Sequence, residues 1–483
     1  MRKIVLSGCV FLLAAVFLLA GCGGGGGGGS DADTPSTLSF YAFDFVQEET
    51  YTITAAKVGE GAHCYVYLEQ GMESAVVDSD IESLASQFDN AIYPRVRNAF
   101  GSEPYPGVDD DPKIYILLMD IKDGYSSGSY IAGYFDAYNE YTGAPGSNEK
   151  EIFYMDVNPG IPSSSTFRKV LAHEFQHMIH WEQKTNRIGL SDNTWLDEAM
   201  SEVAPYFAGY GANYGRVMTF ESVESGNNRS DSLTVWGSDL ADYAVAYMWA
   251  QYMVDRFPDN VFLNILSNDK RGIESVEEYL DTLSAGLTFS SVFRDWSIAV
   301  FSGTNTGLTD NSTWAYKTID TWPGWHEGYD LPGMFTASNR NSSYLPPLAP
   351  WSIDMYWYTS SPLTWTGVSS PSPQASVYDW KDNGALTFSF HPDTPYPFDN
   401  AAILILRNTN DNQTSTSMTN AALAEPSETI LSPAAKLRAV AESAAGRSLA
   451  AATGEPVPVC VHDFLARREK EHRNRMMGGD RAR

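Results

Sequence analysis

A chain of 483 residues is longer than one hydrophobic core usually supports, so we expect two or more structural units. Apolar side chains make up 43% of the sequence and aromatic ones 13%, which argues against a mainly disordered protein. The formal net charge of -28 would repel phosphate groups, so nucleic acid is not expected as a partner.

Residues 1–22 have the pattern of a bacterial lipoprotein signal peptide. Arg2 and Lys3 give a positive start, and residues 10–20 form an apolar run too short to span a membrane comfortably. The run ends in Leu-Ala-Gly-Cys, which resembles a lipobox that is cut before Cys22, the residue then lipidated. The alternative is an ordinary signal peptide with an incidental cysteine.

Residues 23–36 begin with seven glycines and are predicted to be a flexible tether. The N-terminal lipid would make a membrane a partner of this chain. The expected location is therefore the bacterial cell envelope, or the extracellular space. Because Gly23 is not an Asp retention signal, resemblance to enteric lipoproteins points to the outer membrane.

Residues 37–79 are predicted to form an N-terminal β region, because apolar residues alternate there with period two. Cys64 lies in this alternation. It could pair with Cys460, but burial as an apolar residue is the favoured prediction.

Residues 80–301 are predicted to form the largest domain. A helical period covers residues 81–100, buried strands are expected at 113–120 and 151–157, and helical patterns dominate from 163 to 301.

The amino-acid composition changes after residue 301. Residues 302–410 are rich in Ser, Thr, Asn, Pro and Trp with strand-like runs, so we predict a C-terminal β-sandwich-like domain. Residues 411–483 are Ala/Ser-rich and then charged, and no structure is assigned to this tail.

The motif that carries chemistry is His-Glu-Phe-Gln-His at residues 173–177, inside a helical pattern that follows good N-cap serines. His173 and His177 are four residues apart, so both imidazoles face the same side and can bind one Zn²⁺ about 2 Å away. Glu174 projects about 100° round the helix, beside the metal, where it can take a proton from the attacking water.

A catalytic zinc usually keeps three protein ligands and one open position. The next predicted helix carries Glu198, 21 residues after His177, and a helix-turn-helix return fits that gap. We therefore predict Glu198 as the third ligand, with Asp197 as the competing carboxylate. Glu202, one turn later, is predicted to accept the outer N–H of a ligating histidine, most simply His173.

His180 follows His177 by three residues but would overshoot the metal, so a solvated or supporting position is expected. Gly at 180 and His at 183 would mark another subclass of zinc peptidases, and this chain has His180 and Gln183 instead.

HEFQH followed by WLDEAMSE resembles the zinc peptidases whose third ligand is a glutamate, the gluzincins, and among them the hyicolysin-type neutral metallopeptidases. The similarity covers roughly residues 80–301. It implies an α+β fold with a thermolysin-like core, in which a small mixed sheet supports the active-site helices, flanked by N-terminal strands and the C-terminal β domain. It also implies a protein or peptide as substrate.

In similar enzymes a Tyr or His helps to hold the oxyanion. Tyr243 and Tyr247 are the candidates here, each with core packing as the alternative, and Tyr243 is preferred because it is nearer the start of its helix. Such sites also bind substrate as an added strand, and residues 129–134 are the predicted edge.

The predicted function is therefore a zinc-dependent endopeptidase. An aminopeptidase would need carboxylates that capture a free amine, but the loop acids Asp136, Glu140, Glu149 and Glu151 are predicted to be solvated charges. A third possibility is a surface-anchored binding protein with a vestigial zinc site, although retention of Glu174 argues against it. The oligomeric state is not predicted.

The lipid assignment gives a direct prediction. The processed protein should begin at Cys22 and partition into detergent, whereas Cys22→Ser should yield a soluble form. Mass spectrometry of the mature N-terminus decides the question, and an unmodified N-terminus at another residue would refute the anchor.

Overall fold

The computed structural model describes residues 37–225, 231–283, 285–304, 311–321, 324–326, 329–331, 348–358, 374–380, 386–390, 401–409, 411 and 456–479. Cys22, the signal peptide and the tether lie outside these residues, so those assignments stay predictions. All described residues belong to one compact unit, and the expected domain boundaries within it also stay predictions.

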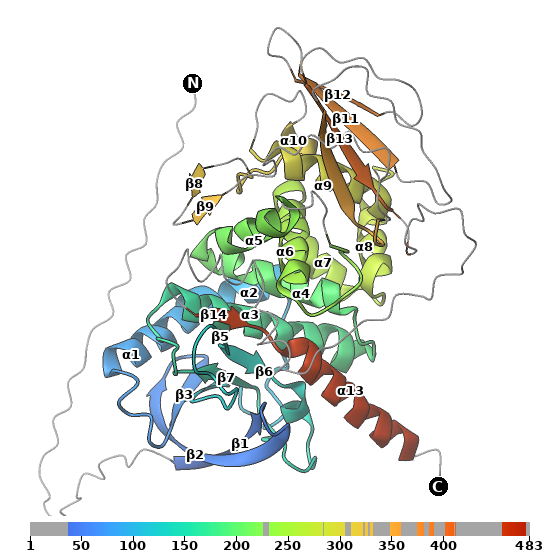
Figure 1. Ribbon diagram of the computed structural model, residues 1–483. Helices are drawn as coiled ribbons and strands as arrows, with labels where there is room; N and C mark the ends of the chain where they lie inside the picture. The colour runs from blue at the N-terminus through green and yellow to red at the C-terminus, as the bar shows by residue number, and fades with distance from the viewer. Residues whose placement is uncertain are drawn as a thin grey trace, which may run out of the picture. The chain divides into compact units, whose positions relative to one another are not determined.

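A curled six-stranded sheet forms the base of the molecule (Figure 1). Its strand order is β1-β2-β3-β4-β7-β6, with β3, β4 and β7 parallel and the other neighbours antiparallel. The strands of this sheet are β1 (Thr37–Asp44), β2 (Glu49–Glu60), β3 (Cys64–Glu69), β4 (Ile114–Met119), β6 (Gly133–Phe135) and β7 (Ile152–Asp156).

The central strands β4 and β7 are buried along their whole length, because both faces of the sheet are covered. One face packs into a core with the helices, which includes Ile116 and Phe153. The other face forms a second core with Phe40 of β1 and with residues near the C-terminus such as Val459 and Leu465. Cys64 is buried and free, as predicted.

Helices follow the sheet in the sequence and stack beyond it (Figure 1). Those that precede or surround the His-Glu-Phe-Gln-His motif are α1 (Asp78–Gln87), η1 (Phe88–Ile92), α2 (Tyr93–Phe100), η2 (Ala137–Glu140), α3 (Ser165–His180), η3 (Trp181–Asn186), α4 (Thr194–Pro205), η4 (Tyr206–Tyr210) and α5 (Tyr214–Ser225). The later ones are α6 (Leu240–Arg256), α7 (Val261–Ser267), α8 (Gly272–Thr282), α9 (Phe289–Ser302) and α10 (Asn311–Trp314). α4 packs between α3 and α6. The predicted combination of a mixed sheet with helices is confirmed.

The region predicted as a β domain contains strands in its described part. β10 (Ile353–Tyr358), β11 (Gln374–Trp380), β12 (Leu386–Phe390) and β13 (Ala401–Arg407) form an antiparallel sheet, and β8 (Gly324–His326) pairs with β9 (Tyr329–Leu331). A sandwich needs two facing sheets, and the described residues show one four-stranded sheet, so the sandwich stays a prediction.

The C-terminal tail, to which the sequence analysis assigned no structure, contains two elements that pack on the core. β14 (Val457–Val459) pairs with β5 (Ser129–Ile131), and α13 (His462–Gly479) follows. Apolar residues at 457, 459 and 461 alternate and are buried, a short strand signal that the charged end of the tail obscured. None of the described helices is both long and apolar enough to cross a membrane.

Candidate metal centre

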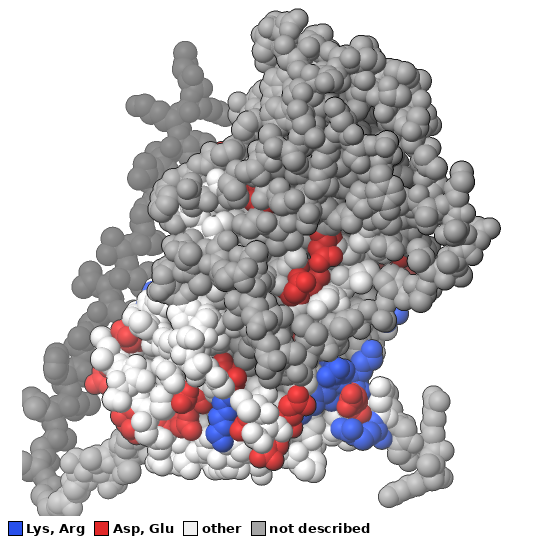
Figure 2. All heavy atoms as spheres, viewed as in Figure 1, with Lys and Arg blue, Asp and Glu red and all other residues white. Residues whose placement is uncertain are grey.

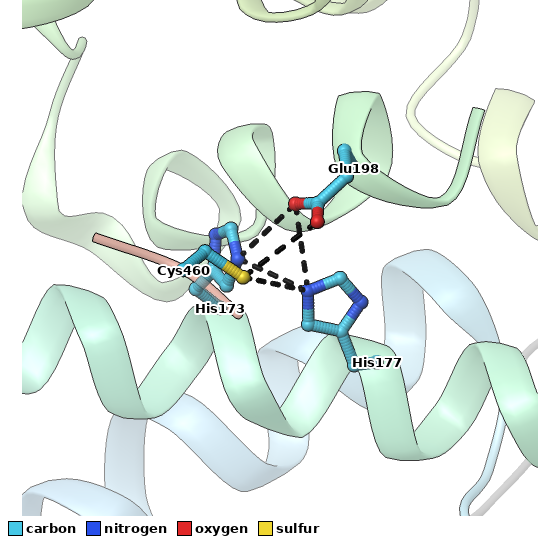
Figure 3. A group of neighbouring side chains, drawn as sticks. All are labelled: His173, His177, Glu198 and Cys460. Atoms are coloured by element: carbon cyan, nitrogen blue, oxygen red, sulfur yellow. Dashed lines mark hydrogen bonds and ion pairs between the residues drawn. The ribbon is translucent and has the colours of Figure 1, made fainter. Parts of the chain in front are cut away.

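Helix α3 carries the motif and is held by a cap at its N-terminus and by the packing of its apolar face. Ser164 caps it, its hydroxyl accepting from the backbone N of Phe167 at 3.1 Å. On the face turned to the sheet, Phe175 stacks on Tyr93 of α2 with ring centroids 5.6 Å apart. His173 and His177 therefore point the other way, towards α4 (Figure 3).

Four donor atoms converge between α3, α4 and the C-terminal segment (Figure 3). The Nε2 atoms of His173 and His177 are 3.1 Å apart, and Glu198 Oε2 lies 3.5 Å and 3.6 Å from them. The fourth donor is Cys460 Sγ, 3.6 Å from Glu198 Oε1 and 3.8 Å from His177 Nε2. All four donors lie within 4.8 Å of one another.

This geometry fits a zinc ion. Donors about 2.0–2.3 Å from a tetrahedral zinc are separated from each other by roughly 3.3–3.5 Å, close to the distances found here. Two imidazoles, a carboxylate and a thiol are all zinc donors. Glu198 is fully buried, yet its Oε2 accepts no hydrogen bond from the described residues. A buried carboxylate oxygen without a hydrogen-bond donor needs a positive neighbour, which a cation at the centre of the cluster would supply.

The electrostatics of the cluster agree with that requirement. Burial by itself would lower the pKa of His177, but the Asp197 and Glu198 carboxylates outweigh it and raise that pKa well above its ordinary value. Burial would also lower the pKa of His173, but contacts with Cys460 and Glu198 outweigh burial and raise that pKa to about 10. The surroundings of both imidazoles therefore favour positive charge, which a divalent cation supplies.

Asp197 and Glu198 are neighbours in sequence but lie on opposite sides of the His177 ring. Glu198 faces the Nε2 side with the other donors, whereas Asp197 Oδ1 lies 2.9 Å from Nδ1. Asp197 is therefore placed to accept the outer N–H of His177 and fix its tautomer, the supporting role common around zinc ligands. Asp197, the competing carboxylate, lies outside the four-donor cluster and forms a second group with His177 and His462, whose donor atoms also lie within 4.8 Å of one another.

Glu202 was predicted to support His173, and the structure places it near that ring without a hydrogen bond. Its Oε1 lies 3.9 Å from His173 Nδ1, too far for one. Instead both carboxylate oxygens accept from Arg216, with Nε to Oε2 at 2.9 Å and Nη2 to Oε1 at 2.6 Å. His180 is buried rather than solvated, its Nε2 3.1 Å from Asp192 and its Nδ1 3.1 Å from Asp197.

Glu174 lies beside the donor cluster, where the sequence placed it. It lines an open cavity of about 160 Å³ together with His173, Ala132, Gly133 and Cys460. Its Oε2 accepts from the backbone N of Phe135 in β6 at 3.0 Å. β6 can approach α3 this closely because residue 133 is a glycine: a Cβ there would be 3.1 Å from Val170 Cγ1 of α3.

Of the two candidate tyrosines, Tyr243 is the one at the cluster. Its hydroxyl lies 3.5 Å from Glu198 Oε1. Burial first, and then the charge of Glu198, raises its pKa well above the ordinary value, so the hydroxyl keeps its proton and can donate. Tyr247 is engaged elsewhere, accepting from the backbone N of Asn213 at 2.7 Å and donating to Gln251 at 3.3 Å.

The prediction of solvated loop charges is wrong for Asp136, Glu140 and Glu151, which are buried; Glu149 is exposed. Arg468 of α13 pairs with Asp136 at 2.8 Å. Burial, reinforced by nearby Glu151, raises the pKa of Glu140 well above its ordinary value. The pattern of isolated acids in a loop could not show that an arginine of the C-terminal tail would pair with Asp136.

Sequence reasoning missed two residues of the site, Cys460 and His462, since both come from the unassigned tail. The ring of His462 stacks on that of His177 with centroids 3.7 Å apart, and its Nε2 lies 2.9 Å from Asp197 Oδ2. The Cys-x-His spacing at residues 460–462 was the available signal.

No model of a known protein family matches the sequence. The chain is 30% identical to the neutral metalloprotease ShpI of Staphylococcus hyicus over 278 residues, which make up 53% of this chain and 60% of that protein. The chain thus spans less than two thirds of the length of this relative. The similarity supports a relation to the metallopeptidases, and the more specific hyicolysin-type assignment stays a prediction.

The place of Asp197 gives a test of the site. Asp197→Asn should lower zinc affinity by about 10- to 100-fold, since loss of such a supporting acceptor has that effect. Competition with a chelator of known affinity measures it. Asp192→Asn is the matched control, because it removes a carboxylate from His180 and from neither ligand imidazole. Unchanged affinity in Asp197→Asn would contradict the assignment.

Proposed function

We propose that this protein is a zinc-dependent endopeptidase in which His173, His177 and Glu198 hold the metal. The observation that carries the proposal is the convergence of these donors beside a cavity that also contains Glu174. The similarity to a neutral metalloprotease supports the same chemistry. The thermolysin-like arrangement of the core, implied by the sequence resemblance, belongs to this proposal.

Zinc at this position would polarise a substrate carbonyl and lower the pKa of a water towards about 7. Glu174 then acts as the base: its buried carboxylate lines the cavity and takes the proton of the attacking water. The hydrogen bond from Phe135 N orients that carboxylate. Tyr243, whose hydroxyl stays protonated, is the proposed donor to the developing oxyanion.

The carboxylates of the cavity favour internal cleavage over removal of N-terminal residues. An aminopeptidase must neutralise a substrate ammonium with a spare carboxylate near the metal. Among the described residues that line this cavity, the acids are Glu174 and Glu202. Glu174 is assigned as the base, and Glu202 is already neutralised by Arg216. A vestigial binding protein would have no need of Glu174 in the cavity.

The proposal includes the location. Anchored through a lipid on Cys22 and separated from the membrane by the Gly-rich tether, the catalytic core would act on proteins or peptides at the bacterial cell envelope, at the outer membrane. Release of the chain without its lipid would place the same activity outside the cell.

The role of Glu174 is tested by Glu174→Gln, which keeps the shape and removes the base. The peptidase kcat/KM should fall by roughly 100- to 10,000-fold, the usual contribution of general-base catalysis, while bound zinc stays at the wild-type level. Metal analysis and cleavage assays on any substrate of the wild type measure both. Glu182→Gln, further along the same chain segment in η3, is the control. Full activity of Glu174→Gln would rule out the mechanism.

Cleavage mode is tested with two peptides of one sequence, one with a blocked N-terminus and one free. We expect cuts inside both, since a substrate held as an added strand extends to both sides of the metal. Mass spectrometry identifies the products. Release of single N-terminal residues from the free peptide alone would establish an aminopeptidase instead.

A further inference from the structure

The substrate edge predicted at residues 129–134 is occupied by the chain's own C-terminal segment. β14 runs parallel to β5, with Val457 opposite Ser129 and Val459 opposite Ile131. The backbone N of Val457 donates to the carbonyl O of Gly128 at 2.7 Å. Residues 456–460 also line the cavity that contains Glu174 and His173. The segment therefore lies where a substrate strand would bind.

Cys460, the residue that follows this strand, places its sulfur next to the proposed metal ligands. Cys460 Sγ is 3.6 Å from Glu198 Oε1 and 3.8 Å from His177 Nε2, separations expected of a thiolate that shares a tetrahedral ion with them. Glu198 Oε2, buried and without a hydrogen-bond donor among the described residues, faces the same centre. The open position of a catalytic zinc would thus be filled by sulfur (Figure 3).

Contacts beyond Cys460 hold the segment in place. His462 stacks on His177, and the Nε1–H of Trp236 points to Asp463 Oδ2 at 3.4 Å. Val461, Phe464 and Leu465 are buried in the core that covers the sheet.

The helix that follows adds charge attraction. Arg468 of α13 forms an ion pair with buried Asp136 at 2.8 Å. The guanidinium carbon of Arg468 also lies over the ring of Phe43, 4.6 Å from the ring centroid. Figure 2 shows Lys and Arg side chains gathered where α13 lies in Figure 1, on a chain whose net charge is -28. Docking of the tail therefore combines apolar burial with attraction between opposite charges.

We propose that Cys460 is a fourth ligand of the metal and that the C-terminal segment 456–479 keeps the peptidase latent by filling the substrate cleft. This inference rests on the proposed function. On coordination the Cys460 thiol gives its proton to solvent, and on displacement by water the sulfur takes a proton back. A side-chain sulfur faces the ligands, so the segment occupies the site without offering a peptide carbonyl to it.

The test uses the full chain loaded with zinc. X-ray absorption at the zinc edge should show a sulfur neighbour at about 2.3 Å in the wild type and none in Cys460→Ser. Cys64→Ser is the matched control, because Cys64 is the other cysteine after residue 36 and is buried away from the site. It should keep the sulfur signal. Alkylation of Cys460 by iodoacetamide should be slow with zinc and fast after chelation.

Activity provides the second readout. Cys460→Ser should raise kcat/KM on a blocked peptide by roughly tenfold or more, since a site open only part of the time loses apparent affinity in proportion. Arg468→Glu, which repels Asp136, should raise kcat/KM to a smaller extent because the thiol remains.

A wild-type zinc site without sulfur would overturn the ligand assignment. Equal cleavage by the wild type and Cys460→Ser would overturn latency and leave the peptidase standing. A third outcome is that the wild type shows the sulfur neighbour and Cys460→Ser lacks it, but that no variant cleaves any peptide. That outcome would overturn the proposed function and leave Cys460 as a ligand.

Discussion

The carboxylate of Glu198 is the constraint around which the site is built. It is fully buried between helices, where an uncompensated charge is costly by several kcal/mol. Its oxygens meet two imidazoles, a tyrosine hydroxyl and a thiol, and its pKa is nevertheless low: burial would raise it, but the charges of His177 and His173 prevail. The two imidazoles and the thiol are placed to bind a cation beside this carboxylate, and Asp197 is placed to orient one of those imidazoles.

A second carboxylate organises the layer behind the ligands. Asp197 lies within 3.1 Å of ring nitrogens of His177, His180 and His462, which come from α3 and from the start of α13. Burial would raise its pKa, but these three histidines hold it well below the ordinary range. Because Asp197 contacts His177 of α3 and His462 of α13, the orientation of the His177 imidazole, a proposed metal ligand, is coupled to the docking of the tail. The conformation of residues near the C-terminus thus affects an imidazole nearly 300 positions earlier.

The sequence was sufficient for those parts of the site that are local. A four-residue spacing on one helix requires His173 and His177 to share a face, and the short return to α4 brings Glu198 opposite them. Continuous apolar runs predicted the buried strands β4 and β7, whereas the mixed sheet was implied by the family resemblance. Local pattern also placed Glu174 beside the ligands, since the angle between successive residues on a helix is fixed.

What the sequence could not supply were partners chosen by tertiary contact. Nothing near Asp136 in the sequence indicates that Arg468 will pair with it, and the Cys-x-His spacing at residues 460–462 does not indicate which distant side chains Cys460 meets. The tail has a helix with many charged side chains, a composition equally typical of a solvated end. Its structure depends on contacts with Phe43, Trp236 and Asp197, which only the folded core brings together.

Tethering explains how a three-residue strand can compete for a cleft. An isolated tripeptide would lose translational and rotational freedom on binding, and its few backbone hydrogen bonds would not offset that loss. β14 belongs to the chain it binds, so its association is intramolecular and its effective concentration does not fall on dilution. In the proposed latent peptidase a substrate must therefore displace both the strand and the sulfur. Access to the proposed metal site would then depend on the packing of the tail as well as on the cleft itself.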